Sequence, residues 1–181
     1  AITFTKKTLG QIVFLHFIQK KGWLGVPLNG EWGDGDKNYI FNSTKNYQGS
    51  SYFNEILEPL FYNALNRQRD NDEYENVKIP FLNGGLFSPV ENYDWKKTNF
   101  NIPNSIWFNK EQNGFLDILS QYNFTVDESD PTEQDIAVDP EMLGKIFESL
   151  LDPEERHNKG AHYTPREIVH FMCIESIAYN I

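Results

Sequence analysis

LGQIVFLHFIQKK, residues 9–21, is the stretch that decides the fold class of this chain. Its apolar side chains fall on nearly every side of a helix, which is typical of a helix buried between other elements. The two lysines at its end suit the negative end of a helix dipole, and Gly22 suits the left-handed position that follows a helix. The stretch therefore predicts a buried helix that ends at Gly22, with Trp23 and Leu24 folding back onto it. His16 is expected to be a hydrogen-bonded core histidine.

A second helical pattern covers residues 51–66, where apolar residues recur three and four positions apart. Pro59 lies inside this pattern and predicts a kink or a restart of the helix. A short helix is expected over residues 114–120. Residues 77–87 predict a β-prone start and a tight glycine turn that packs its apolar neighbours into the core, and residues 122–126 predict a strand. The fold class expected is mainly α: a helical domain with a minor β-hairpin.

Composition narrows the range of partners. The chain has 181 residues, a formal net charge of −10 and one cysteine, Cys173. Such an acidic chain is a poor main surface for DNA, because phosphates are bound by clustered lysines and arginines. A lone cysteine forms no internal disulfide, which fits a buried, inert thiol in a reducing cytoplasm, and no long uncharged apolar run predicts a membrane span. Local basic spots remain at residues 6–7, 20–21, 67 and 69, 96–97 and 156–159.

One acidic pattern resembles a calcium loop without completing it. Asp34, Asp36 and Asn38 have the spacing of the first ligands of such a loop. Tyr39 stands where the loop requires glycine, and Lys45 stands where it requires a bidentate glutamate. We therefore expect a solvated turn.

A second pattern is half of a nuclease signature. Asp94 and Lys96 match the end of an Asp…Asp/Glu-x-Lys motif, whose chemistry needs a further upstream acid on a neighbouring strand. No acid upstream lies in a strand-like run, so we expect surface charges here. The sequence assigns no metal ligand and no catalytic residue to this chain.

GAHYTPREIVHFM, residues 160–172, is the most informative motif. Thr164 can cap a helix through its hydroxyl, Pro165 suits the first helical position, and Glu167 completes a capping box. Such a helix start has free N–H groups and a positive dipole end, which suit a carboxylate or phosphate ligand. On the local pattern alone, a well-capped core helix is the simpler interpretation.

The same motif resembles motif X of the gamma-class adenine-N6 DNA methyltransferases. The preceding residues 139–151 resemble the helix before motif X in large fused restriction–modification enzymes of the type IIG kind. Residues 14–24 and 79–87 resemble the helical region of the same proteins, so four blocks follow the family's order. His162 departs from the family, which often carries an aromatic ring there.

This resemblance implies a cofactor and a partner. His162, Tyr163, Thr164 and Pro165 would line part of an S-adenosylmethionine pocket. The parent protein would act on double-stranded DNA and carry an adjoining methyltransferase domain. If it also carries a nuclease domain, that domain would need Mg²⁺. The family's glycine-rich motif I and its Asn-Pro-Pro-Tyr or Phe catalytic motif do not occur here. This segment alone is therefore expected to be inactive.

The expected organisation is a helical connector or scaffold domain over residues 1–138, followed by a helix and motif X over residues 139–181. The second part would open a methyltransferase domain whose catalytic motifs lie beyond Ile181. An alternative is a stand-alone helical connector that binds DNA or protein without catalysis. A third hypothesis is an acidic helical domain with no connection to DNA.

Overall fold

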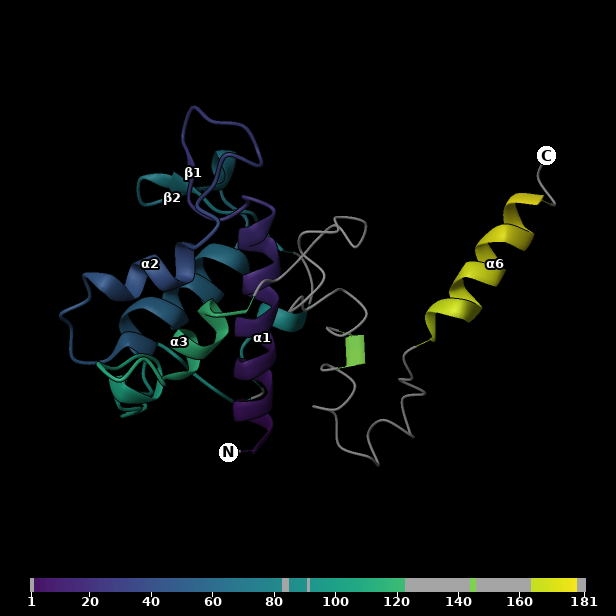
Figure 1. Ribbon diagram of the computed structural model, residues 1–181. Coiled ribbons are helices and arrows are strands. Elements are labelled where there is room, and N and C mark those ends of the chain that lie inside the picture. Colours follow the sequence, from purple (N-terminus) through teal and green to yellow (C-terminus); the bar gives the residue numbers. More distant parts are fainter. Residues whose placement is uncertain (1, 83–84, 91, 123–143, 146–163, 179–181) are drawn as a thin grey trace.

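The computed structural model describes residues 2–82, 85–90, 92–122, 144–145 and 164–178. Within these ranges, helices dominate and a small three-stranded antiparallel sheet accompanies them (Figure 1). The predicted mainly α fold with a minor hairpin is confirmed. The domain boundary expected after residue 138, all but residues 144–145 of the helix expected from residue 139, and nearly all of the strand expected over residues 122–126 lie outside the described residues, and residues 144–145 are helical.

Helix α1 (Ile2–Lys20) runs through the centre of the N-terminal body. It begins seven residues before the predicted start, and Phe4 in its first turns packs edge-on against Phe53, with ring centroids 5.7 Å apart. Its buried residues occupy all sides of the helix over residues 10–19, as the all-round apolar pattern predicted. His16 is buried, and its Nδ1 lies 2.9 Å from the Ile12 carbonyl oxygen. Burial lowers the pKa of this ring to about 4, so the predicted core histidine is confirmed as a neutral one.

The end of α1 is a Schellman motif. The Gly22 N–H donates to the Gln19 carbonyl at 2.8 Å, and the Trp23 N–H donates to the Ile18 carbonyl at 3.2 Å. Gly22 has a φ of +67°, the left-handed conformation that the sequence predicted, and Leu24 is fully buried. The helix end and the fold-back that follows it are thus confirmed.

The second predicted helix is formed, but by wider turns than an α-helix has. Two π-helical segments, η1 (Phe53–Leu57) and η2 (Leu60–Leu65), stand on either side of Pro59. The backbone stays helical at Pro59, with φ −59° and ψ −39°, so the helix does not end there. Proline has no N–H to give to the helical ladder, and π turns are a common response to such an interruption. The buried apolar residues are Tyr52, Phe53, Leu57, Leu60, Phe61, Tyr62, Ala64 and Leu65.

The sheet has the strand order β1-β3-β2, with both pairs antiparallel. Its strands are two residues each: β1 (Val26–Pro27), β2 (Glu73–Tyr74) and β3 (Val77–Lys78). The short 3₁₀ turn η3 (Asp70–Asp72) leads into β2. The β-prone start predicted at residue 77 is therefore confirmed, while β1 had no strand signal because so short a strand shows no alternation.

After the sheet, the chain returns to α1 through the 3₁₀ turn η4 (Gly85–Phe87). Phe87 is buried, and Leu82 and Leu86 pack partly against the core, so these apolar neighbours of the expected glycine turn pack inward as predicted, while residues 83–84 lie outside the described residues. Two side chains of α1 hold this turn: the Lys7 Nζ donates to the Gly85 carbonyl at 2.9 Å, and Gln11 donates to the Leu86 carbonyl at 2.7 Å.

The remaining elements of the body are short. Helices α2 (Tyr39–Lys45) and α3 (Phe115–Ser120) contact each other and lie on the same side of α1 (Figure 1), and the 3₁₀ turn η5 (Asn104–Ile106) precedes α3. The helix predicted over residues 114–120 is thus confirmed. Helix α6 (Arg166–Ala178) is the longest described element outside the body. No helix in the described part of the chain is long and apolar enough to cross a membrane.

Candidate functional site

The motif X-like residues are described in part. Thr164 and Pro165 are exposed and directly precede α6, while His162 and Tyr163 lie outside the described residues. The Pro165 carbonyl accepts from the N–H of Ile168 at 3.0 Å and from that of Val169 at 3.1 Å. The first helical hydrogen bonds are therefore accepted one residue later than predicted, which makes Pro165 the cap.

The predicted capping box, with Thr164 as the cap of the helix, has to be corrected. With Pro165 at the cap position, Thr164 stands one residue too early for its hydroxyl to reach the third helical N–H. Among the described residues, no hydrogen bond joins Thr164 to Glu167. The helix start is still an exposed one, and the first N–H groups of a helix have no acceptor within the helix.

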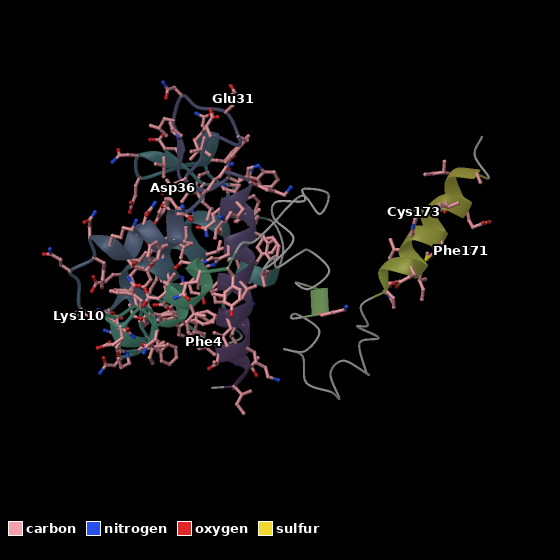
Figure 2. All side chains as sticks on the ribbon, viewed as in Figure 1. Phe4, Glu31, Asp36, Lys110, Phe171 and Cys173 are labelled. Atoms are coloured by element: carbon pink, nitrogen blue, oxygen red, sulfur yellow. The ribbon has the colours of Figure 1, made fainter. Side chains whose placement is uncertain are left out.

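Helix α6 itself is apolar on nearly all sides and exposed. Its large apolar side chains have 44% to 64% of their surface open to solvent: Ile168, Val169, Phe171, Met172, Ile174 and Ile177. Figure 2 shows Phe171 and Cys173 on this helix. Cys173 is exposed, so the buried thiol predicted from the sequence was wrong for the described structure. A helix with apolar residues all round is typical of the interior of a larger domain.

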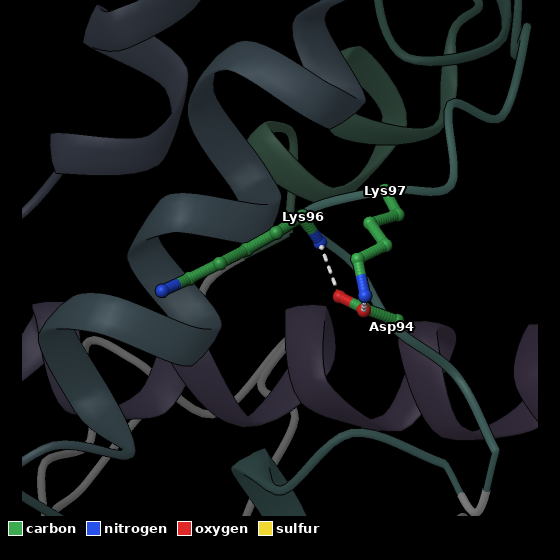
Figure 3. A network of polar contacts seen from close by, with 3 residues as sticks. All are labelled: Asp94, Lys96 and Lys97. Carbon is green, nitrogen blue, oxygen red and sulfur yellow. Dashed lines mark hydrogen bonds and ion pairs between the residues drawn. The ribbon is translucent and has the colours of Figure 1, made fainter.

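Asp94 belongs to an exposed turn, not to a nuclease centre. Figure 3 shows its carboxylate with the two lysines that follow it. One carboxylate oxygen pairs with the Lys97 Nζ at 3.0 Å, and the other accepts from the Lys96 N–H at 3.2 Å. The Lys96 side chain extends away from this carboxylate, with its Nζ 5.7 Å from the centre of the Trp95 ring. The two residues of the half signature therefore do not converge on a common site.

The calcium-like residues cap turns of the backbone. Asp34 accepts from the Glu31 N–H at 2.9 Å, and Asp36 accepts from the Asn38 N–H at 2.8 Å and from the Asn42 side chain at 2.7 Å. These contacts are those of a hydrogen-bonded turn, which is what the sequence predicted. In the described ranges, no group of three or more His, Cys, Asp or Glu side chains could hold a metal ion.

A hollow of about 420 Å³ lies where η2 ends and the sheet begins. Six residues line it: Asn63, Arg67, Gln68, Arg69, Asp70 and Tyr74. Two of these are the arginines of a basic spot noted in the sequence. No sequence pattern indicates the hollow, because its walls come from a helix end and a hairpin whose meeting depends on tertiary structure.

A buried acid is a further feature that the sequence did not indicate. Glu58 is 1% exposed, and the Tyr93 hydroxyl donates a hydrogen bond to its carboxylate. Burial raises the pKa of Glu58 to about 7, while the hydrogen bond from Tyr93 opposes that rise. Aromatic rings surround Tyr93: its ring stacks on Phe100 at 5.2 Å and meets Phe4 at 5.3 Å. The only local signal is a glutamate within an apolar helical pattern, and exposed glutamates produce the same pattern.

Comparison with known proteins gives one informative similarity. The chain is 28% identical over 192 aligned residues to a protein of Methanocaldococcus jannaschii named "Putative type II restriction enzyme and methyltransferase". That similarity supports a relationship to restriction–modification proteins. It covers 96% of this chain but 14% of the other protein's length. No protein-family profile matches the chain, and no solved structure matches it.

Proposed function

We propose that this chain is a segment of a site-specific adenine-N6 DNA methyltransferase of the fused restriction–modification kind. Its helical body serves as a scaffold, and residues 162–165 complete part of the S-adenosylmethionine pocket. The observation that supports this most directly is α6, which follows the motif X-like residues and exposes apolar side chains on nearly all sides. Such a helix needs a surrounding domain, and the similar M. jannaschii protein is about seven times longer than the matched region.

The start of α6 fits the cofactor proposed for it. The methionine part of S-adenosylmethionine ends in a carboxylate, and the first N–H groups and positive dipole end of a helix favour such a group. Thr164 and Pro165 are exposed at this end, so neither blocks the approach of a ligand. His162 and Tyr163 precede them directly and are proposed to line the same pocket. The cofactor supplies the methyl group, and these residues only bind and orient it.

The wider setting is part of the same proposal. Double-stranded DNA is the substrate of the parent protein, an adjoining methyltransferase domain is its internal partner, together with a nuclease domain if the parent also cleaves DNA, and the cytoplasm is its compartment. A DNA adenine must leave the base stack before it can be methylated, and the pocket that receives it belongs to catalytic motifs absent from residues 1–181. Mg²⁺ is required only where the parent also cleaves DNA.

A methyl-transfer assay tests this function. Residues 1–181 alone should transfer no methyl group from S-adenosylmethionine to DNA, whereas the natural reading frame that includes them should methylate adenine. In that longer protein, Tyr163→Ala should raise the KM for S-adenosylmethionine by roughly tenfold, about 1.4 kcal/mol of lost binding. Lys110→Ala, an exposed change on the body, is the control and should leave KM unchanged. Methyl transfer by the 181 residues alone would contradict the proposal.

A stand-alone connector is the second candidate function. The body has its own core: Ile12, Leu15, Phe53, Leu57, Phe61 and Phe87 are all at most 1% exposed. A unit that buries such a core can fold and bind without the rest of a larger protein. A reading frame that stops soon after Ile181, with no glycine-rich or Asn-Pro-Pro motif, would favour this candidate over the enzyme segment.

A further inference from the structure

We infer that the hollow at the end of η2 binds a phosphate of the DNA backbone, with Arg67 as its principal contact. This inference takes from the proposed function only that the partner is duplex DNA. It adds a contact on the helical body, separate from the α6 end and its cofactor.

The first argument is that Arg69 reverses the polarity of this helix end. The last carbonyls of a helix carry partial negative charge and would repel a phosphate. The Arg69 guanidinium donates to two of them, those of Asn63, at 2.9 Å, and Ala64. It donates as well to the carbonyls of Glu73, at 2.8 Å, and Ile79, at 2.6 Å. A fixed positive charge therefore covers the carbonyls that would otherwise face the hollow.

The second argument is that the same contacts make the hollow rigid. Arg69 joins the end of η2 to strand β2 at Glu73 and to Ile79, the residue after β3, and its guanidinium lies 5.7 Å from the centre of the Tyr74 ring. Because all its donor groups are directed at backbone carbonyls, Arg69 supplies charge and shape but has little capacity left to bind a ligand directly.

The third argument is that neighbouring donors remain available. Arg67 and Gln68 are exposed, and within the described ranges neither side chain has a hydrogen-bond or ion-pair partner. The side-chain amide of Asn63 likewise has no such partner within the described ranges, because the contact between Asn63 and Arg69 uses the Asn63 backbone carbonyl. A guanidinium and two amides around one hollow provide several N–H donors, which is what phosphate oxygens accept.

Several other basic side chains on the body are already engaged. Lys7 donates to the Gly85 carbonyl, Lys97 pairs with Asp94, and the Lys21 Nζ lies 5.8 Å from the centre of the Trp23 ring. Arg67 differs from these because it lines a hollow and has no such contact within the described ranges. Asp70 also lines the hollow, and its negative charge should weaken phosphate binding.

The experiment is a salt titration of duplex-DNA binding by residues 1–181, followed by fluorescence anisotropy. Arg67→Ala should weaken binding by roughly three- to tenfold on any duplex sequence and lower the salt slope by about one. Asp70→Asn should strengthen binding by roughly twofold, because it removes an opposing charge from the same hollow. Lys110→Ala is the matched control, since it removes one positive charge from the exposed loop between η5 and α3 (Figure 2) and should change binding little.

Four outcomes would overturn the inference. They are no salt-dependent binding at low salt, equal effects of Arg67→Ala and Lys110→Ala, weaker binding by Asp70→Asn, and inorganic phosphate bound as tightly as the duplex, which would indicate a site for free phosphate. The variants should keep the unfolding temperature of the natural chain, because Arg67, Asp70 and Lys110 are exposed. Failure of the methyl-transfer assay leaves this result standing, and loss of Arg67-dependent binding leaves the cofactor proposal standing, so the two are tested separately.

Discussion

Glu58 shows how one side chain can make stability depend on pH. Its carboxyl group is buried beside Tyr93, and Tyr62 is the other titratable neighbour, whose pKa the Glu58 carboxylate helps to raise. Both neighbours are phenols whose own pKa values are raised, so neither is charged where Glu58 titrates. With no cationic partner in the described ranges, the ionised form is the unfavourable one.

The prediction is that Glu58 makes the protein less stable as pH rises. Its pKa in the folded state, about 7, lies above the ordinary 4.5, so its contribution is fully present below about pH 4.5 and lost as pH passes 7. Glu58→Gln keeps an acceptor for the Tyr93 hydroxyl but cannot ionise. Its free energy of unfolding should exceed that of the natural chain by roughly 1 to 2 kcal/mol near pH 8, after solvent screening is allowed for, and match it near pH 4.

Urea denaturation at both pH values provides the measurement. Glu111→Gln is a suitable control, because Glu111 is an exposed glutamate whose side chain has no hydrogen-bond or ion-pair partner within the described ranges. A Glu58→Gln variant that is less stable than the natural chain at both pH values would show that the carboxylate is needed in its ionised form, contrary to the prediction.

At the scale of elements, the end of α1 depends on glycine for two reasons. Gly22 has positive φ, and a Cβ added to it would lie 2.0 Å from the Gly33 carbonyl oxygen. That oxygen belongs to the backbone of a loop which is itself bonded to Gly22, through N–H groups of Gly33 and Gly35 at 3.1 and 2.9 Å. Neither partner can move without breaking the other's hydrogen bonds.

We therefore predict that Gly22→Ala lowers the free energy of unfolding by more than the left-handed conformation alone would cost. That conformation costs an alanine about 1 kcal/mol, and the clash should bring the total to roughly 2 to 4 kcal/mol. Thermal unfolding followed by circular dichroism measures the change. Gly85→Ala is the matched control, because a Cβ there meets nothing within 4 Å, and it should change stability little. Similar losses in the two variants would refute this account of Gly22.

Elements whose cause is local could be predicted from the sequence. The helix ending at Gly22 and the helix over residues 114–120 follow from periodicity and a glycine cap, which act within a few residues. The π turns around Pro59 could not be predicted, since a proline in a helical pattern allows a kink, a break or a wider turn. The hydrogen bonds of the Arg69 guanidinium join residues on different elements, so no short window of sequence contains them.

At the scale of the whole molecule, the described parts differ in how they treat apolar residues. The body buries its apolar residues in one main cluster, whereas those of α6 are exposed. The sequence pattern of α6 correctly predicted an apolar helix. Its exposure could not be predicted, because burial of a side chain depends on contacts with residues far away in the sequence, which no local pattern contains. His162 and Tyr163 remain predictions, since they lie outside the described residues.

Exposed apolar surface of this extent predicts self-association of the 181-residue chain. Sedimentation velocity should show concentration-dependent association, and Phe171→Ser combined with Met172→Ser should weaken it at least tenfold, about 1.4 kcal/mol. These two side chains are 64% and 58% exposed. Leu28→Ser combined with Ile106→Ser is the matched control, because it removes two exposed apolar side chains from the body, 48% and 51% exposed. A chain that stays monomeric at high concentration, or a control pair that acts as strongly, would mean that α6 is not the associating surface.

In the longer reading frame, the Phe171 and Met172 variants should instead lower stability, because there a surrounding domain would bury both side chains.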